Sequence, residues 1–365
     1  MSDAAASRAP LSVLWVLHGA LERDRGRLTS RLASARYRAL IPARHLAAHG
    51  IHSEFLCLGE SAPPARCPRA DVVVLSKSFD AEAIAVAESA RAQGSALIAD
   101  FCDDHFDHPR LGACHRRLAA LADRVTAATA AMAETVAART GRAATLVDDP
   151  YEGPAGAPAF APAPERVKLL WFGGLTNLDS VLMMMAALVP FAAERALDLH
   201  LVTAPAPELV AACAEWHRKL APRIALRLTP WSLDATWAAL AAADLVAIPT
   251  DRHLAGGPGR TVKSPNRMVE ALRAGRFPLA HPIPAYQELG AYGWVDDDLI
   301  MGLGWALAHP EAVRARIAAG QAAIAARFAP EVVARSWAAA LRGAAAARRG
   351  SDRTAAEPAL SGATP

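Results

Sequence analysis

Short apolar runs alternate with longer alanine-rich stretches of helical period along most of the chain. This alternation is typical of βαβ units, in which helices join parallel strands. The first half predicts strands over 11–17, 53–58, 72–75, 95–99, 124–127 and 144–147, and helices over 36–49, 81–93, 112–122 and 130–140. Residues 1–150 are therefore predicted to form one complete doubly wound, Rossmann-like domain.

The composition changes at Pro150, where PYEGPAGAPAFAPAPER shows no helical or strand period and predicts a linker over 151–166. The alternation then restarts, so a second Rossmann-like domain is expected over 167–329. Its strands are predicted over 168–172, 198–203, 224–228, 245–248 and 277–280, and its helices over 178–195, 207–220, 233–242, 265–274, 284–289 and 310–328. A closing helix is expected within 330–345, and the Gly, Ala, Arg, Ser, Thr and Pro content of 346–365 predicts a disordered tail.

Composition agrees with two domains and narrows the class of protein. The length of 365 residues exceeds the usual size of one domain, and 53% hydrophobic residues suffice for two cores. The 39 basic residues are scattered among 36 acidic ones, which argues against nucleic acid as the main partner. Five cysteines without a CxxC pair favour a reducing cytoplasm. No apolar run predicts a signal peptide or a membrane span, and a peripheral contact at the inner face of the membrane stays open.

The segment KSPNRMVEALRAGRFPLA carries the most specific pattern in the chain. Ser264 is a favourable N-cap, Pro265 suits the first helical position, and Gly275 is expected to end the helix. The free N–H groups at such a helix start, beside Lys263 and Arg267, would form a compact anion site.

The same helix carries a polar face. Asn266, Glu270 and Arg273 follow one another at helical spacing. A carboxylate one and a half turns inside a helix whose start binds anions suits a ligand with both phosphate and hydroxyl groups, such as a nucleotide sugar. The alternative is an ordinary surface helix with a solvated polar face.

Two loops that follow predicted strands add to this hypothesis. In WFGGLTN, Gly173 and Gly174 would let backbone N–H groups approach a diphosphate, and Asn177 lies at the start of the next helix. Thr229 and Trp231 follow another strand and could offer backbone groups and an aromatic face to a nucleobase. Packing of Trp231 in the core is an equally open interpretation.

The first domain offers an acidic loop, DFCDDHFDH, after its strand over 95–99. Asp103, Asp104 and His105 could act as a general acid or base, or could bind substrate hydroxyls. A metal site is not predicted, because the spacing of Cys102, the histidines and Cys114 is not a standard zinc pattern. The alternative is a solvated acidic loop.

The loop after the first strand lacks G-x-G-x-x-G, so dinucleotide binding through that fingerprint is disfavoured. Arg36 and Arg38 flank Tyr37 at the expected start of a helix, where guanidinium groups could meet phosphate or carboxylate. Both arginines could instead be solvated.

Together these motifs resemble the GT-B-type glycosyltransferases, especially family 4 (group 1). The resemblance lies in the Gly173-Gly174 loop, the W-S-x4-W run that ends at Pro249, KSPNRMVEALRAGRFPLA as a phosphate-binding and E-A-x3-G region, and FAPEVVARSWAAAL as a closing helix that crosses back to the first domain. SARYRALIPARHLAAHGI and ADFCDDHFD are similar to segments of some bacterial members. One feature departs: of the family's two glutamates, Glu270 matches the second, while Val262 stands at the first.

The resemblance implies two doubly wound domains facing across a cleft, and transfer of a sugar from a nucleotide diphosphate sugar to a glycan, lipid-linked or small-molecule acceptor. Lys263 and Arg267 would neutralise the diphosphate and Glu270 would hold ribose hydroxyls, without a metal or other cofactor. The further donor residues would be Gly173, Gly174, Asn177, Thr229, Trp231, Ser264 and Asn266, and the acceptor side would use Asp103, Asp104 or His105. A nucleotide-sugar epimerase and a catalytically silent GT-B-like binding or scaffold protein remain alternatives, the latter because of Val262.

Overall fold

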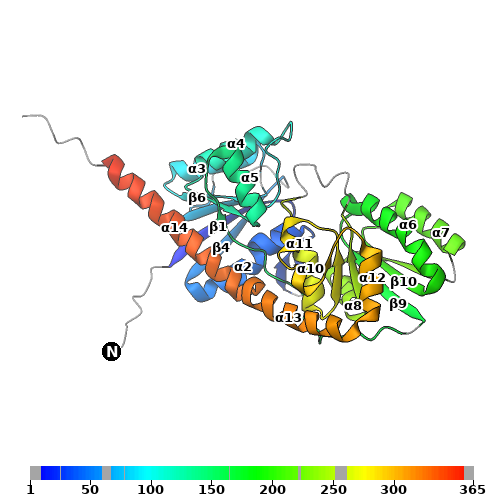
Figure 1. Ribbon diagram of the computed structural model, residues 1–365. Coiled ribbons are helices and arrows are strands. Elements are labelled where there is room, and N and C mark those ends of the chain that lie inside the picture. The colour runs from blue at the N-terminus through cyan, green and yellow to red at the C-terminus, as the bar shows by residue number, and fades with distance from the viewer. Residues whose placement is uncertain are drawn as a thin grey trace, which may run out of the picture. The chain divides into compact units, whose positions relative to one another are not determined.

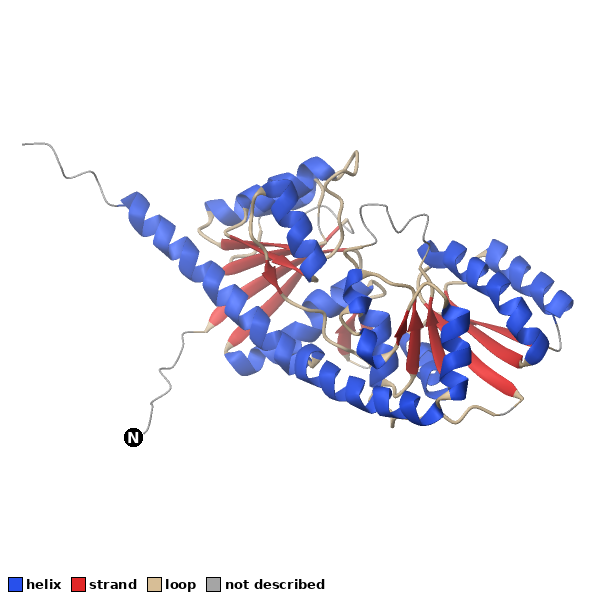
Figure 2. Ribbon diagram, in the orientation of Figure 1, coloured by secondary structure: helices blue, strands red, loops and turns tan. Residues whose placement is uncertain are grey.

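The computed structural model describes residues 10–24, 26–59, 67–77, 79–163, 165–220, 223–250 and 261–356. The chain divides into two compact units, one of Met1–Pro150 with Pro330–Pro365 and one of Tyr151–Ala329 (Figure 1). Each unit contains a six-stranded parallel sheet flanked by helices (Figure 2). The predicted fold class of two doubly wound α/β domains is confirmed.

The sheet of the first unit has the strand order β4-β1-β5-β6-β7-β8. Its central strands β1, β5 and β6 are apolar and buried on both faces, as is usual in parallel sheets. The strands are β1 (Leu11–His18), β4 (Ile51–Leu58), β5 (Val72–Ser76), β6 (Ala96–Phe101), β7 (Arg124–Ala127) and β8 (Thr145–Leu146). The helices are α1 (Ala33–Ala35), the π-helical turn Arg36–Leu40, α2 (Ile41–Leu46), a 3-10 turn Ala47–His49, α3 (Ala81–Ala92), α4 (Gly112–Leu121) and α5 (Ala130–Thr140).

The last helix, α14 (Pro330–Ala356), belongs to this first unit. Trp337 is fully buried and meets Trp15 of β1 edge to face, with ring centroids 4.9 Å apart. Such a pair anchors the helix through both its buried area and its ring geometry. Helix α14 runs beyond the expected end at position 345, so the prediction of disorder is wrong for 346–356. Ala344 and Ala345 are buried in the core, and alanine is the strongest helix former.

The sheet of the second unit has the order β11-β10-β9-β12-β13-β14. The strands are β9 (Arg166–Phe172), β10 (Ala196–Thr203), β11 (Ile224–Pro230), β12 (Leu245–Ile248), β13 (Phe277–Ala280) and β14 (Trp294–Val295). The helices are α6 (Leu178–Glu194), α7 (Pro207–Leu220), α8 (Leu233–Ala242), α10 (Asn266–Arg273), α11 (Pro284–Gln287), α12 (Leu299–Ala308) and α13 (Pro310–Phe328), with 3-10 turns Leu175–Asn177 and Gly290–Tyr292.

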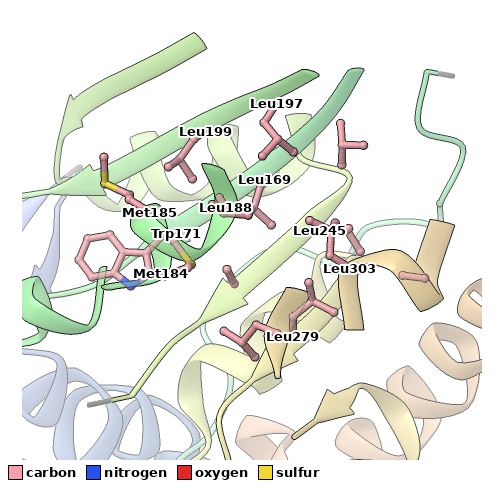
Figure 3. Packing of buried hydrophobic residues seen from close by; sticks show 14 of the residues in the cluster. Leu169, Trp171, Met184, Met185, Leu188, Leu197, Leu199, Leu245, Leu279 and Leu303 are labelled. Carbon is pink, nitrogen blue, oxygen red and sulfur yellow. The ribbon is translucent and has the colours of Figure 1, made fainter. Parts of the chain in front are cut away.

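Alternate residues of β9 fill two separate cores, because successive side chains of a strand point to opposite faces. Leu169 and Trp171 pack with α6, α12 and α13 (Figure 3). Leu170 and Phe172 pack with α8 and α10 on the other face. This double burial fixes β9 at the centre of the sheet and so fixes where its carboxyl end emerges.

The segment predicted as a linker is bound to the second unit. Gly156 N donates to Arg273 O at 2.9 Å, Ala159 N donates to Gly275 O at 3.2 Å, and Phe160 is buried in the core beside α6. Glycines permit this close packing, because a Cβ built on Gly275 would lie 2.0 Å from Ala157 O. The low periodicity of the segment therefore reflects extended backbone laid along α10.

Three strands and one α-helix of the described residues were not predicted. They are β2 (Glu22–Asp24) and β3 (Arg27–Thr29), which form an antiparallel hairpin, strand β14, and helix α12. The three strands are only two or three residues long, which is too short to show a period of two. Helix α12, LIMGLGWALA, is almost wholly apolar, so it shows no alternation of polar and apolar faces.

Candidate functional site

The strand order of the second unit reverses between β9 and β12. From β9 the chain moves outward to β10 and β11, and it returns to β12 on the other side of β9. Open α/β sheets bind ligands outside the carboxyl ends of their strands at such a switch point. Gly173 follows β9 there, and α10 is the helix that leads from β12 to β13. The candidate site therefore lies at the end of β9 and the amino end of α10.

Gly173 and Arg267 meet at this point. A Cβ built on Gly173 would lie 3.5 Å from Arg267 Nη1 and 3.2 Å from Trp171 Cζ2. Arg267 Nη1 is buried and has no hydrogen-bonding partner within the described part of the chain. A buried N–H donor without a partner is unfavourable, and a charged one more so. An anion beside Gly173 would satisfy it.

Two backbone groups of the Gly173-Gly174 loop are already hydrogen-bonded within the protein. Gly173 N donates to Val202 O at 3.2 Å, which extends the pairing of β9 with β10. Gly174 is exposed, and its carbonyl accepts from Asn177 N at 3.1 Å and from Asn177 Nδ2 at 3.4 Å. The loop thus offers Gly173 as a close-approach position rather than as an N–H donor, and Asn177 stabilises the loop.

Helix α10 begins differently from the prediction. Pro265, at φ −80° and ψ 21°, is the N-cap, and Asn266 is the first helical residue. The prediction of Ser264 as the N-cap is therefore wrong, because the non-helical ψ of Pro265 moves the start by one residue. Pro265 has no side-chain acceptor, so the N-cap residue itself does not cap a first-turn N–H group. Lys263 is exposed, and Ser264 and Asn266 are half-buried.

Glu270 is buried, with 2% of its surface exposed. Its Oε1 accepts from Glu152 N at 2.6 Å and its Oε2 accepts from Gly153 N at 2.9 Å. The guanidinium of Arg273 lies 4.3 Å from the ring centroid of Tyr151. The polar face of α10 therefore holds residues 151–153. Binding of ribose by Glu270 stays a prediction, and the carboxylate has a backbone partner that sequence reasoning missed.

The predicted nucleobase residues have protein partners. Thr229 Oγ1 lies 2.8 Å from His200 Nε2, and Trp231 N donates to Thr203 O at 3.0 Å. The Trp231 side chain is partly buried against the core beside α8, which is the packing role left open above. Burial lowers the pKa of His200, and Arg227 lowers it further, so the imidazole is neutral near pH 7.

In the first unit, the three acidic-loop residues lie after β6 but have different partners. Asp103 is buried and its Oδ2 lies 2.9 Å from Lys77 Nζ. Asp104 Oδ1 accepts from Phe106 N at 3.1 Å, a contact within the loop. The His105 ring packs 5.3 Å from the buried ring of His115. The interpretation as a wholly solvated loop is wrong for Asp103, and the catalytic roles stay predictions.

Lys77 is a residue that sequence reasoning missed. It follows β5 directly and, in the described part of the chain, is the one non-glycine residue at positive φ, 53°. Burial disfavours its ammonium, but Asp103 outweighs this and raises the pKa of Lys77. A sequence signal existed, since a lone lysine ends the apolar run VVVLS. Strained backbone after a strand is common at ligand sites.

Two other titratable groups near Lys77 and Asp103, the Cys102 thiol and the His115 imidazole, stay uncharged at neutral pH. Burial raises the pKa of the Cys102 thiol and Asp103 raises it further, so the thiol stays protonated. Burial lowers the pKa of His115 to about 3, with His105 contributing, so this imidazole stays neutral. Among the described residues, no group of three or more His, Cys, Asp or Glu side chains is placed to hold a metal ion.

Arg36 and Arg38 are buried, so the interpretation of solvated arginines is wrong for both. The expectation that a guanidinium meets a carboxylate is confirmed for Arg38, whose partners are side chains of the protein itself. Arg38 donates to both carboxylate oxygens of Asp100, at 2.7 and 3.0 Å, and to Asp149 Oδ1 at 2.9 Å. Arg36 Nη1 donates to Ser30 O at 2.7 Å. The π-helical turn directs these side chains into the unit, which no local sequence pattern reveals.

One cavity of the second unit lies away from the candidate site. It has a volume of about 410 Å³ and lies over the early parts of β9, β10 and β11, and its lining includes Lys168, His200 and Ala239. None of the predicted donor residues lines it. The site at Gly173 and Arg267 is defined by strand order and by the buried Arg267 Nη1, which has no hydrogen-bonding partner among the described residues.

The two doubly wound units have the GT-B fold, which the chain shares with solved glycosyltransferases. Anabaena HepE, solved with UDP-glucose, aligns with a TM-score of 0.63 at 15% identity and covers 91% of this chain and 99% of its own. A glycosyltransferase of Rickettsia africae aligns with a TM-score of 0.67 at 9% identity, covering 92% and 98%. The lipopolysaccharide galactosyltransferase WaaB gives 0.58 at 12% identity, covering 90% and 98%.

The sequence matches no family model and no curated protein. Membership of family 4 therefore stays a prediction, and the structural likeness establishes the fold. In the described ranges, no helix is long and apolar enough to cross a membrane.

Proposed function

We propose that this protein transfers a sugar from a nucleotide diphosphate sugar to a hydroxyl group of a glycan, lipid-linked or small-molecule acceptor. The observation that carries the proposal is the buried Arg267 Nη1, which has no partner among the described residues and lies beside Gly173 at the switch point of the second sheet. The HepE structures hold UDP and UDP-glucose in the same fold, which favours UDP as the first nucleotide to test.

The residues at the start of α10 would stabilise the leaving group. Breaking the bond between sugar and diphosphate develops negative charge on the diphosphate. Arg267, the exposed ammonium of Lys263 and the first-turn N–H groups of α10 are cationic or positively polarised groups at one point. They could carry this charge without a metal ion.

The first unit would supply the acceptor side. Asp103 and Lys77 form an ion pair beyond β6 and β5, with 41% of the lysine side chain exposed. A carboxylate and an ammonium side by side can accept from and donate to the same acceptor hydroxyl. Asp103 is the stronger candidate base, because the Asp104 carboxylate accepts within its own loop. All five cysteines are free thiols, which supports a reducing compartment such as the cytoplasm.

A catalytically silent binding protein is the second candidate, favoured by one observation. Val262 stands where family 4 enzymes often carry a glutamate, and it is 2% exposed. Without that carboxylate, the site could bind a nucleotide and fail to transfer the sugar.

Calorimetry with UDP tests the donor site first. Arg267→Ala should weaken UDP binding by about 10- to 150-fold, the loss expected for one hydrogen bond to a charged group. Arg218→Ala, which removes an exposed arginine of α7, is the matched control. Equal affinities in wild type and Arg267→Ala would remove the nucleotide from this site.

Release of UDP from UDP-glucose, measured with a panel of saccharide acceptors, then separates the two candidates. Turnover that depends on an acceptor supports transfer. Tight UDP binding without turnover on any donor of a nucleotide-sugar panel supports the silent binding protein.

A further inference from the structure

A second charged site lies in the first unit. It is at the amino ends of the parallel strands, whereas the acidic loop follows the carboxyl end of β6. It is an open cavity of about 420 Å³ between the later part of α14, the start of β1 and the residues that precede β5 and β6. Its polar lining is Ser12, Arg69, Asp71, Gln93, Arg348 and Arg349. Three guanidinium groups from two distant parts of the chain therefore surround one hollow.

The single carboxylate of the cavity is already engaged. Asp71 Oδ2 accepts from Ser12 N at 2.8 Å and from Ser12 Oγ at 2.7 Å. Arg69 and Arg349 are exposed, and neither forms an ion pair with any residue that the structure describes. Asp71 offsets one of the three guanidinium charges, so the lining of the cavity keeps a net positive charge.

Capping of the carboxyl end of α3 accounts for only part of this cluster of arginines. Arg348 Nη2 donates to Arg91 O at 3.3 Å, near the end of α3. The Nε of Arg348 is buried and has no hydrogen-bonding partner among the described residues, so the contact with Arg91 does not use every donor of this guanidinium. The carbonyl dipole at the end of α3 carries about half a charge, which is less than the charge of the three arginines.

We propose that this cavity binds a phosphate-bearing anion. Guanidinium groups match phosphate oxygens in geometry and charge, and several of them around one hollow favour a group with three acceptor oxygens. The cavity is larger than one phosphate, so the ligand carries its phosphate on a larger body, either a lipid headgroup or a soluble phosphorylated molecule. This site is independent of the proposed donor site, which belongs to the other unit.

Pyrophosphate titrations test the site once the donor site is weakened. In an Arg267→Ala background, pyrophosphate should bind, and adding Arg69→Ala with Arg349→Ala should weaken that binding at least about tenfold. Both arginines are exposed, so the substitutions should leave folding intact. Arg335→Ala, at an exposed position of α14 outside the cavity, is the matched control.

Vesicles of phosphatidylcholine with and without phosphatidylglycerol identify the source of the phosphate. Binding only to the anionic vesicles, lost with Arg69→Ala and Arg349→Ala, assigns the cavity to a lipid headgroup. Pyrophosphate binding without vesicle binding assigns it to a soluble ligand. The proposal is overturned if neither probe distinguishes the double substitution from Arg335→Ala.

Discussion

The carboxylate of Glu270 and the backbone N–H of Gly153 are joined by a hydrogen bond of 2.9 Å across 117 positions of sequence. The second oxygen of Glu270 binds Glu152 N in the same way. Glu270 thus holds the backbone of Glu152 and Gly153, where the chain enters the second unit. Any role of Glu270 at a nucleotide must be separated from this one.

Glu270→Gln should destabilise the second unit. The amide has one acceptor oxygen instead of two, so one of the two backbone N–H groups loses its partner in a buried place. We expect a loss of about 1–3 kcal/mol in the free energy of unfolding, measured by urea denaturation. Glu194→Gln, at an exposed position at the end of α6, is the control and should change it by less than about 0.5 kcal/mol. Unchanged stability with lost UDP affinity would instead support direct ribose binding.

Gly275→Ala tests the packing of the entering segment along α10. Gly275 has φ +74°, and a Cβ there would lie 2.0 Å from Ala157 O. Strain and clash together should cost at least about 2 kcal/mol. Gly304→Ala provides the contrast: Gly304 lies within α12 with nothing within 4 Å of its Cβ position, so the change should stabilise by about 0.5–1 kcal/mol. A tolerated Gly275→Ala would show that the segment can leave α10 at little cost.

Local patterns predicted most strands and helices of both units, because buried parallel strands and alanine-rich helices are visible in short windows. The same patterns allowed a carboxylate partner for Arg38 but did not identify Asp100 and Asp149, which lie far along the chain. They also missed the partner of Glu270. In both cases the deciding contact joins residues separated by more than sixty positions, so only the assembled sheet brings them together.

The candidate site was likewise predicted only in part from local patterns. The charge pattern around Lys263 and Arg267 was visible in the sequence, although the predicted helix start was off by one residue. That Arg267 lies against Gly173 depends on the strand order β9-β12, which the sequence does not state. Lys77 was missed because its significance rests on backbone strain and on a pair with Asp103.

The ion pair between Lys77 and Asp103 should be strongly non-additive. Lys77→Gln leaves Asp103 buried without its cation, which should cost about 1–3 kcal/mol after allowance for the exposed part of the lysine. In the double variant Lys77→Gln with Asp103→Asn, the unpaired carboxylate charge is also removed, so most of that loss in stability should be recovered. Urea denaturation of the four proteins completes the cycle. Additive losses would mean that the pair contributes nothing of its own.

Because the pKa of Lys77 is raised, the contribution of the ion pair to stability should persist at neutral pH. It should disappear only as the pH rises above the ordinary lysine range.

His115 should make stability fall in acid. Burial lowers its pKa from 6.5 to about 3, so the unfolded chain takes up a proton at this site at a pH where the folded chain does not. The stabilising effect is complete above the unfolded pKa of 6.5 and is lost as the pH falls toward about 3. Between pH 6.5 and pH 4.5 this one group should lower the free energy of unfolding by about 2–3 kcal/mol.

His115→Gln isolates this effect, because glutamine is neutral throughout the range. Its own packing cost is the same at both pH values, so the change in stability between them is the quantity to compare with wild type. We expect the variant to lose about 2–3 kcal/mol less than wild type over this interval, by urea denaturation at each pH. His108→Gln is the control, since that side chain is half-buried and lies in the same loop region. An equal acid loss in wild type and His115→Gln would mean that the folded protein protonates His115 readily, and that the cluster of Phe79, Phe101 and Phe106 around its ring opens to water.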